Sequence, residues 1–270
     1  MFSDSSNSAS TTSTTIPPEI YDIAFGWDPA PEVERLLYLC RDAGLEPRSA
    51  LELGCGTGRL LRALQGRLPE LYGLDLSSQM VNYACEHLNT ENCISQLPHV
   101  FIADMSDFTL DRTFDLIHVS ANTLRWVCRP QSITSLWRCV AQHLRPGGLF
   151  IADLEFGVAE EASKVGQSAT WTLSRGETLV RAAWTVVEPP SRATRCCKVE
   201  WVFEVTRGEP AGCWSEEFAL RTYDADEFLR LATAEGQLEP RGFYLLRDPY
   251  LFETPTNRAV GRMLVALRRA

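Results

Sequence analysis

Three glycines at alternate positions, Gly54, Gly56 and Gly58, follow a short apolar run that contains the carboxylate of Glu52. Leucines at helical spacing come next, so the segment predicts a strand, a tight turn and the first turn of a helix. Glycine lets the backbone of such a turn approach a ligand closely and adopt angles that a side chain resists. The stretch 51–59 therefore predicts a turn that binds a nucleotide-like ligand at a helix N-terminus.

The spacing of the glycines separates two kinds of cofactor. A dinucleotide-binding turn has the pattern G-x-G-x-x-G, whose third glycine would fall where this sequence has Arg59. The pattern present is Glu-x-Gly-x-Gly-x-Gly, and it resembles the first motif of the class I S-adenosylmethionine (SAM)-dependent methyltransferases. In that family the carboxylate, here Glu52, lies near the methionine end of the cofactor. The glycine loop, which includes Cys55, passes beneath it.

Two further apolar runs end in a carboxylate. Residues 71–75 end in Asp75 and residues 100–105 contain Asp104 near their end, so both segments predict short buried strands. Asp75 lies 17 residues beyond Gly58, close to the separation at which an acidic residue meets the ribose hydroxyls in nucleotide-binding βαβ units. We expect the three strand ends to share one edge of a parallel sheet, where ligands bind.

The resemblance extends these positions to a set of cofactor-binding residues. It implies that Asp104 accepts a hydrogen bond from the adenine amino group and that Met105 offers its backbone N–H. It also implies that Met80 packs against the adenine, for which an ordinary core position is the alternative. The N-terminal aromatic segment, with its Tyr21-Asp22 pair, would fold over the cofactor or pack its first helix onto the sheet. The expected set is completed by Leu76, Ser120 and Tyr21.

The fourth predicted strand, residues 113–120, carries the only histidine that invites a catalytic interpretation. His118 alternates with Ile117 and Val119, so it points away from them, and packing beneath a helix is favoured over catalysis. Asn122, just beyond the strand, is better placed to line a pocket. The Asn-Pro-Pro-Tyr-like signature of enzymes that methylate nucleobase or amide nitrogens is absent here, which favours a small-molecule acceptor. The sequence leaves the catalytic residues, and whether a general base exists, unassigned.

The string Leu-Arg-Pro-Gly-Gly-Leu-Phe-Ile at 144–151 also resembles this family, and it predicts a turn from a helix into a fifth strand. With two later strands, the chain predicts an α/β fold: a doubly wound, mostly parallel seven-stranded sheet, Rossmann-like, with an antiparallel β insert after the fifth strand. The predicted organisation is a Ser/Thr-rich disordered tail over 1–15, an aromatic segment and helix over 16–45, and a methyltransferase domain over 46–270.

Period-2 alternation within residues 165–222 predicts an antiparallel cap. Small-molecule methyltransferases, including amino-sugar N-methyltransferases, carry strands at this point that cover the active site. The resemblance therefore implies that aromatic residues of the cap line a substrate pocket, while a lid or a homodimer surface is the alternative. The expected substrate-binding residues are Asn122, Trp126, Trp171, Trp184 and Trp201.

Composition narrows the class of partners. A net charge of −9 and a pI near 5.1 argue against nucleic acid as a substrate, and no apolar run has the length of a membrane span. The nine cysteines show no paired C-x-x-C spacing, so we expect reduced thiols, a cytoplasmic location and no metal site.

Together these features predict a SAM-dependent methyltransferase that moves a methyl group to an N or O atom of a small molecule. Two alternatives remain open at this stage. The first is a SAM-binding partner or sensor protein without methyl transfer, because a cofactor site does not establish turnover. The second is a nicotinamide oxidoreductase, against which the missing third glycine counts.

Overall fold

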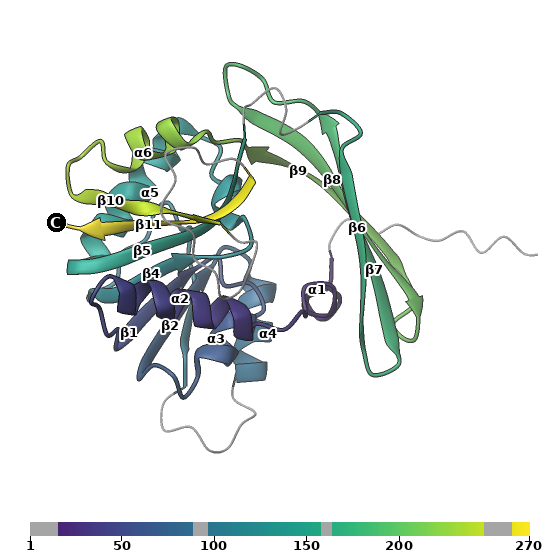
Figure 1. Ribbon diagram of the computed structural model, residues 1–270. Helices are drawn as coiled ribbons and strands as arrows, with labels where there is room; N and C mark the ends of the chain where they lie inside the picture. The colour runs from purple at the N-terminus through teal and green to yellow at the C-terminus, as the bar shows by residue number, and fades with distance from the viewer. Residues whose placement is uncertain (1–15, 89–96, 158–163, 246–260) are drawn as a thin grey trace, which may run out of the picture.

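The computed structural model describes residues 16–88, 97–157, 164–245 and 261–270. The predicted disordered tail, residues 1–15, lies outside the described residues. The described part has two bodies, a layered α/β unit and a separate antiparallel sheet, with one short helix between them (Figure 1).

The larger unit is built on a seven-stranded sheet in the order β10-β11-β5-β4-β1-β2-β3. All neighbouring strands are parallel except around β11, which is antiparallel to both β5 and β10. The predicted fold class, a doubly wound and mostly parallel sheet, is confirmed. In chain order the strands are β1 (Ser49–Leu53), β2 (Glu70–Asp75), β3 (His99–Ile102), β4 (Phe114–Val119), β5 (Leu144–Phe156), β10 (Leu238–Leu245) and β11 (Gly261–Arg269).

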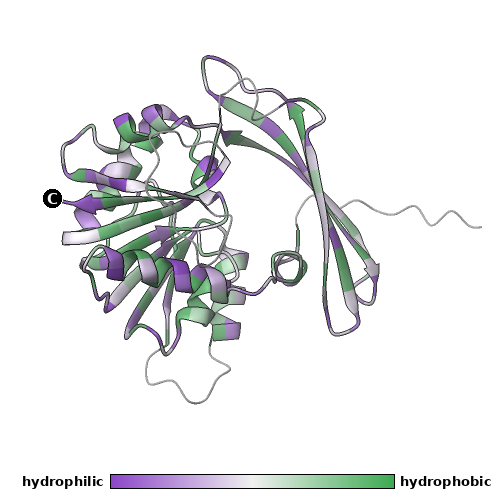
Figure 2. Cartoon of the chain, viewed as in Figure 1, coloured by the Kyte–Doolittle hydropathy of each residue, from purple (hydrophilic) through white to green (hydrophobic). Residues whose placement is uncertain are grey.

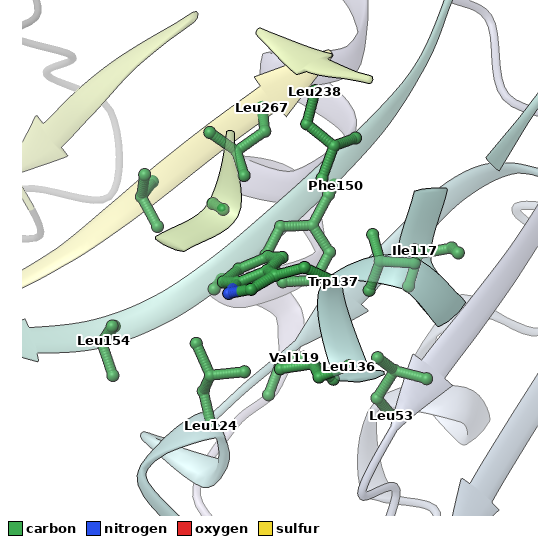
Figure 3. Packing of buried hydrophobic residues seen from close by; sticks show 14 of the residues in the cluster. Leu53, Ile117, Val119, Leu124, Leu136, Trp137, Phe150, Leu154, Leu238 and Leu267 are labelled. Atoms are coloured by element: carbon green, nitrogen blue, oxygen red, sulfur yellow. The ribbon is translucent and has the colours of Figure 1, made fainter. Parts of the chain in front are cut away.

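Helices cover both faces of this sheet because its central strands are apolar on both sides. Leu51 and Ile117 point to the layer formed by α5 (Pro130–His143), α6 (Ala225–Ala232) and the 3-10 helix η1 (Thr123–Trp126). Figure 3 shows the centre of that layer, where Trp137 packs among leucines and Phe150. Ala50 and Leu116 point to the opposite layer of α2 (Ala30–Asp42), α3 (Arg59–Leu64) and α4 (Ser78–Leu88).

The fifth strand departs from the prediction. The sequence predicts a turn at Pro146-Gly147-Gly148, but β5 begins at Leu144 directly after α5 and runs through these residues. Its register against β4 shifts between Phe114 and Leu116, so β5 absorbs extra residues as an irregularity of the strand. A Cβ at Gly148 would lie 2.9 Å from the carbonyl oxygen of Arg145. The glycine is therefore required for a bulge in the strand rather than for a turn.

The second body is a four-stranded antiparallel meander in the order β6-β7-β8-β9, which we call the cap. Its strands are β6 (Ser168–Arg175), β7 (Thr178–Glu188), β8 (Cys196–Arg207) and β9 (Cys213–Arg221). Helix α1 (Pro18–Ala24) lies between the cap and the large sheet (Figure 1), and it carries both hydrophobic and hydrophilic residues (Figure 2). Ile20 and Ile23 pack with Val180 and Phe203 of the cap. The sequence predicted an aromatic segment here but not this helix, and the division into domains stays a prediction.

Candidate active site

The glycine loop lies where the order of the parallel strands reverses, since β1 has β2 on one side and β4 on the other. The N–H groups of Gly54 and Cys55 both donate to the carbonyl oxygen of Leu74, at 2.8 and 2.9 Å. The Gly56 N–H donates to Asp75 Oδ2 at 2.8 Å. The loop after β1 and the end of β2 therefore hold each other in place.

Close approach explains the first glycine of the motif. Gly54 has a φ of +70°, and a Cβ there would lie 2.5 Å from Thr123 Cγ2 and 3.2 Å from Met105 Cε. Any side chain would strain the backbone and push residues of two other segments apart. Gly58, with a φ of +77°, instead packs against α4, where a Cβ would lie 3.3 Å from Ala84 Cβ. The structure thus gives Gly58 a packing role.

A cavity of about 700 Å³ lies between the strand ends, α1 and the cap. It is large enough for a nucleoside cofactor, given that ligand pockets commonly occupy roughly 300–1,000 Å³. Ten of the predicted site residues line it: Tyr21, Gly54, Gly56, Asp75, Leu76, Met80, Asp104, Met105, Trp126 and Trp201.

Four predicted cofactor residues do not line this cavity: Glu52, Cys55, Gly58 and Ser120. The Cys55 side chain points toward β2, because a Cβ at Gly73 would lie 2.9 Å from Cys55 Sγ. The Cys55 side chain therefore packs against β2 and does not line the cavity. Ser120 Oγ lies 3.4 Å from His118 Nδ1. The position of Ser120 at the end of a strand therefore did not bring it to the cavity.

Two buried polar atoms beside the glycine loop have no partner among the described residues. They are Glu52 Oε2 and Arg59 Nη1. Burial raises the pKa of Glu52 to about 8, against the opposing effect of the nearby Arg59 guanidinium. Arg59 Nη2 is held by Glu32 at 2.9 Å. The loop is thus flanked by a buried carboxylate oxygen and a buried guanidinium nitrogen that form no hydrogen bond among the described residues.

The other two carboxylates are positioned by backbone N–H groups and keep acceptor capacity. Asp75 accepts from Ser77 N at 2.9 Å in addition to Gly56 N. Burial raises the pKa of Asp75, and those two N–H groups oppose the shift. Asp104 Oδ1 accepts from the backbone N–H and the hydroxyl of Ser106, at 2.8 and 2.7 Å. Because a carboxylate has about four lone-pair sites, both side chains can also accept from a ligand.

His118 lies outside the site. It pairs in register with Glu52 of β1 and points to the layer of α2, α3 and α4. The side chain is fully buried, and burial lowers the pKa of the imidazole to about 4, so the ring is neutral near pH 7. The structure agrees with the expectation that this histidine is packed rather than catalytic.

The cap contributes a second cavity of about 380 Å³, and Trp201 lines both cavities. Trp171 and Trp184 also line the second one, as does Asn122. Asn122 Oδ1 accepts from Glu155 N at 2.6 Å, so this side chain is partly used in fixing β5. Trp126 lines the first cavity and stacks on Phe218 at 4.2 Å between ring centroids. The predicted aromatic residues therefore surround two adjoining spaces.

Asp22 of α1 joins the two bodies. Its carboxylate accepts from Thr57 Oγ1 at 2.5 Å and from Arg62 at 2.8 Å, and it pairs with Arg175 of β6 at 2.7 Å. Burial opposes ionisation, but these three partners outweigh it and hold the pKa of Asp22 below its usual range. One residue thus ties the glycine loop, α3 and the cap together.

Sequence reasoning missed several residues of the first cavity, because no local pattern marks them. They come from segments whose positions depend on tertiary packing: Gln79, Thr123, Arg129, Ser132 and Glu216. Thr123 could have been inferred only from the close approach of η1 to Gly54.

The sheet order, the reversed β11 and the glycine loop beside two strand-end carboxylates define an α/β protein that binds a nucleoside-type cofactor. Residues 50–148 match the family model described as a methyltransferase domain.

Two curated relatives and one solved structure resemble the chain beyond this motif region. An N,N-dimethyltransferase for dTDP-4-amino-2,3,4,6-tetradeoxy-D-glucose from Saccharopolyspora spinosa is 30% identical over 50% of this chain and 53% of its own. The chain thus matches only about half the length of that relative. An N,N-dimethyltransferase for dTDP-3-amino-3,4,6-trideoxy-α-D-glucopyranose from Streptomyces venezuelae is 26% identical over 90% of this chain and 94% of its own. The crystal structure of Streptomyces venezuelae DesVI has a TM-score of 0.76 at 22% identity, covering 96% of this chain and 100% of that one, and shows the shared fold.

The matched methyltransferase domain and the methyltransferases that the chain is similar to support the predicted resemblance to the class I SAM-dependent methyltransferases, whose cofactor is SAM. The described residues fit that molecule. The amino-acid end of SAM carries an ammonium and a carboxylate, which match the unpartnered atoms of Glu52 and Arg59. Asp75 and Asp104 offer acceptors for ribose hydroxyls and an adenine amino group. The individual cofactor contacts stay predictions.

Proposed function

We propose that the protein transfers methyl groups from SAM to the amino group of a small acceptor, namely an amino sugar carried on a nucleotide. The observation that carries this proposal is the wall of the first cavity. It is continuous from the strand ends, Gly54 and Asp75, to the aromatic cap at Trp201. A methyl donor bound by the loop and an acceptor bound under the cap would therefore share one enclosed space.

The similarity through the cap supports an amino sugar as the acceptor. The Streptomyces venezuelae relative aligns over most of the chain, so its alignment includes the segment that we expect to select the acceptor. That relative is an N,N-dimethyltransferase for an amino sugar linked to dTDP. A pocket of tryptophans suits a sugar ring, because apolar sugar faces stack on aromatic rings while hydroxyls remain free for hydrogen bonds.

Nitrogen is favoured over oxygen because the cavity lacks a strong base of the usual kind. None of the chain's four histidines is among the described residues that line it. A hydroxyl acceptor generally requires proton removal in the transition state, whereas an amine attacks once it is uncharged. Aromatic faces and carboxylates also favour a cationic amine over an anionic acceptor.

The chain's own residues act mainly by positioning. Bound SAM supplies an electrophilic methyl group on a positively charged sulfur. The glycine loop and Asp75 fix the donor end of the cavity, while α1 and the cap exclude water from the acceptor end. Tyr21 lies between them, with its ring 6.1 Å from that of Trp201. Burial raises the pKa of the Tyr21 hydroxyl, which therefore stays protonated as a hydrogen-bond donor.

The test is a methyl-transfer assay with SAM and a panel of dTDP-linked amino sugars that carry the amine at C3 or C4. Each is matched by the sugar with a hydroxyl in place of the amine. We expect mass spectrometry to detect products heavier by one or two methyl groups for an amine and none for its hydroxyl counterpart. Methylation of the hydroxyl sugars alone would contradict the proposal. So would SAM binding without turnover on any amine, which would favour a partner or sensor protein.

Three expectations about surroundings stay predictions. Pairing of two copies through the cap is one, and light scattering of the purified protein measures it. The others are a cytoplasmic location and the absence of nucleic acid and membrane partners. In the described ranges no helix has the length and apolarity to cross a membrane. The eight cysteines that the structure describes are free, as expected for a reducing compartment.

A further inference from the structure

One acidic residue stands out on the inner face of the cap. Strand alternation and register place Trp201 of β8 directly opposite Glu216 of β9, so both side chains point to the same side of the sheet. Their neighbours on that side are apolar, since Phe203 and Trp214 form the next pair along the two strands. Glu216 therefore places a carboxylate within an aromatic surface.

Glu216 also lies on the wall of the first cavity, together with Trp201 and Tyr21. A Cβ at Gly56 would lie 3.9 Å from Tyr21 Cε1, and the Tyr21 ring stacks on Trp201. This series of contacts runs from the cofactor loop through α1 to the cap strand pair that carries Glu216. Glu216 thus belongs to the cap wall of the same cavity that the glycine loop lines.

No residue in the described part of the chain forms a hydrogen bond or ion pair with the Glu216 carboxylate. The acidic residues Glu200 and Glu217 lie on the other side of the cap, where Glu217 pairs with Lys198 at 2.5 Å. Glu216 is exposed at the cavity wall, and a carboxylate that stands beside aromatic rings without a partner contributes little to folding, because desolvation disfavours it. Partial burial correspondingly raises the pKa of Glu216. This arrangement suits a carboxylate whose partner is a ligand.

The charge around the cavity indicates which ligand. Besides Glu216, the described charged residues on its wall are Asp75, Asp104 and Arg129. Asp75 and Asp104 belong to the cofactor end, so Glu216 is the acidic group of the cap end. With Trp126 and Trp201 beside it, the carboxylate and the two rings form a site for a cation, because aromatic faces and a carboxylate both attract positive charge.

We propose that Glu216 binds the protonated amino group of the acceptor and receives the proton that the nitrogen must lose before it attacks. This inference rests on the proposed function, since it assigns the amine-binding group of the same site. Glu216 is then a catalytic residue that touches the substrate. Many of the described carboxylates have partners within the chain, whereas Glu216 has none among the described residues and can serve the acceptor.

The proposed step balances. An N–H bond of the ammonium breaks, its electron pair stays on nitrogen, and the proton goes to the carboxylate oxygen of Glu216. The nitrogen lone pair then forms the N–C bond to the methyl carbon while the C–S bond breaks and its electrons go to sulfur. The products are a methylated ammonium and neutral S-adenosylhomocysteine. The proton on Glu216 passes to water when the products leave.

The experiment compares Glu216→Gln with Glu217→Gln, a neighbour on the outer face that loses the same charge. The acceptor probe is dTDP-3-amino-3,4,6-trideoxy-α-D-glucopyranose, with the 3-hydroxyl sugar as its uncharged analogue. Calorimetry measures SAM binding first and then the binding of each sugar to the protein saturated with S-adenosylhomocysteine. Steady-state kinetics over a range of pH give kcat and KM for the amine.

We expect Glu216→Gln to bind SAM like wild type and the hydroxyl sugar unchanged, but the amine about 10-fold more weakly. Its kcat/KM should fall about 100-fold, the lower end of the range for general acid–base groups. The loss should shrink at high pH, where the free amine is already uncharged. Glu217→Gln should match wild type in every measurement.

Three results overturn the inference. The first is an equal loss of affinity for the amino sugar and for the hydroxyl sugar in Glu216→Gln, which would indicate a structural role for Glu216. The second is unchanged kinetics in Glu216→Gln while wild type methylates the amine, which leaves the proposed function intact. The third is a loss of activity that is the same at every pH. If wild type methylates no amine, the proposed function fails, and the binding comparison with S-adenosylhomocysteine still decides whether Glu216 recognises the ammonium.

Discussion

The two walls of the cavity are built in different ways. The cofactor wall consists of backbone turns and strand ends, and its positions are fixed by bonds between neighbouring strands, such as those from Gly54 and Cys55 to Leu74. The cap wall consists of side chains, chiefly Trp201 and Glu216, which stand on a sheet with its own hydrophobic clusters. One wall is made by the main chain of a buried sheet and the other by the side chains of a smaller one.

This difference separates two tasks. A backbone turn at the end of a buried strand cannot change without disturbing the core, so it suits a cofactor that all relatives share. Side chains on one face of an antiparallel sheet can change without altering its hydrogen bonds, so they suit an acceptor that differs between relatives. Helix α1 is the joint between them, through Asp22 and Arg175.

The largest effect is expected at the cofactor wall, from a substitution of the buried Glu52. Its folded-state pKa of about 8 exceeds the value of about 4.3 expected in the unfolded chain. The contribution of protonated Glu52 to the free energy of unfolding is therefore complete below pH 4. It falls as the pH rises, until Glu52 is ionised in both the folded and the unfolded state above pH 8. Glu52→Gln removes this loss. As the pH rises from 5 to 9, we expect the free energy of unfolding of the variant to increase by about 4 kcal/mol relative to that of wild type. Urea unfolding without cofactor measures this difference.

The exposed Glu46→Gln controls for the removal of one negative charge. A difference between Glu52→Gln and wild type that is the same at every pH would contradict the raised pKa. Saturating S-adenosylhomocysteine provides a second check, because its ammonium should favour the ionised carboxylate and flatten the pH dependence of wild type.

The next prediction concerns the contacts of Asp22, through which α1 holds the two walls together. Asp22→Ala removes the partner of Thr57, Arg62 and Arg175 together, and we expect a loss of about 2–3 kcal/mol in the free energy of unfolding. The guanidinium groups keep access to solvent, so the cost stays below that of a fully buried pair. Hydrogen exchange should quicken in β6 and β7 more than in β1 and β4. Exposed Asp42→Ala is the control, and equal stability of the two variants would contradict the role of Asp22.

The contrast between the walls also explains how much the sequence revealed. The glycine spacing and the acids Asp75 and Asp104 are local patterns, and the structure places all of them at the first cavity except Gly58. Residues 168–221 form an antiparallel sheet with the alternation that the sequence predicts. Local patterns were sufficient wherever a residue's role depends on its own strand or turn.

The contacts that join the bodies could not be predicted in this way. Arg175 donates a hydrogen bond to the backbone carbonyl of Asp22, although the two residues are 153 positions apart in the sequence. No sequence pattern links them. No sequence motif marks Glu216 as a site residue, and only the strand register shows that it shares a face with Trp201. Ser120 shows the opposite case: its place at a strand end predicts a position at the cavity, whereas its hydroxyl lies beside His118 and it is not among the residues that line the cavity.

A smaller effect is expected at the cofactor wall, where a substitution of Asp75 should change the affinity for SAM. Asp75→Ala removes an acceptor for ribose hydroxyls and leaves the N–H groups of Gly56 and Ser77 without a partner. We expect SAM affinity to weaken by about 1–3 kcal/mol, measured by calorimetry. Asp111→Ala, an exposed acid away from the cavity, should bind SAM like wild type. Unchanged affinity in Asp75→Ala would contradict the assignment of Asp75 to the cofactor.

The smallest effect is expected at the cap wall, where a comparison of two tryptophan substitutions measures the contribution of one hydrogen bond. Trp171 Nε1 donates to the carbonyl oxygen of Ala24 at 2.6 Å, whereas the ring nitrogen of Trp184 makes no hydrogen bond within the described ranges. Both rings line the second cavity, so replacing either by Phe removes a similar aromatic area. Trp171→Phe should therefore lose about 1 kcal/mol more stability than Trp184→Phe in urea unfolding. Equal losses would mean that α1 is held to the cap by apolar contact and Asp22 alone.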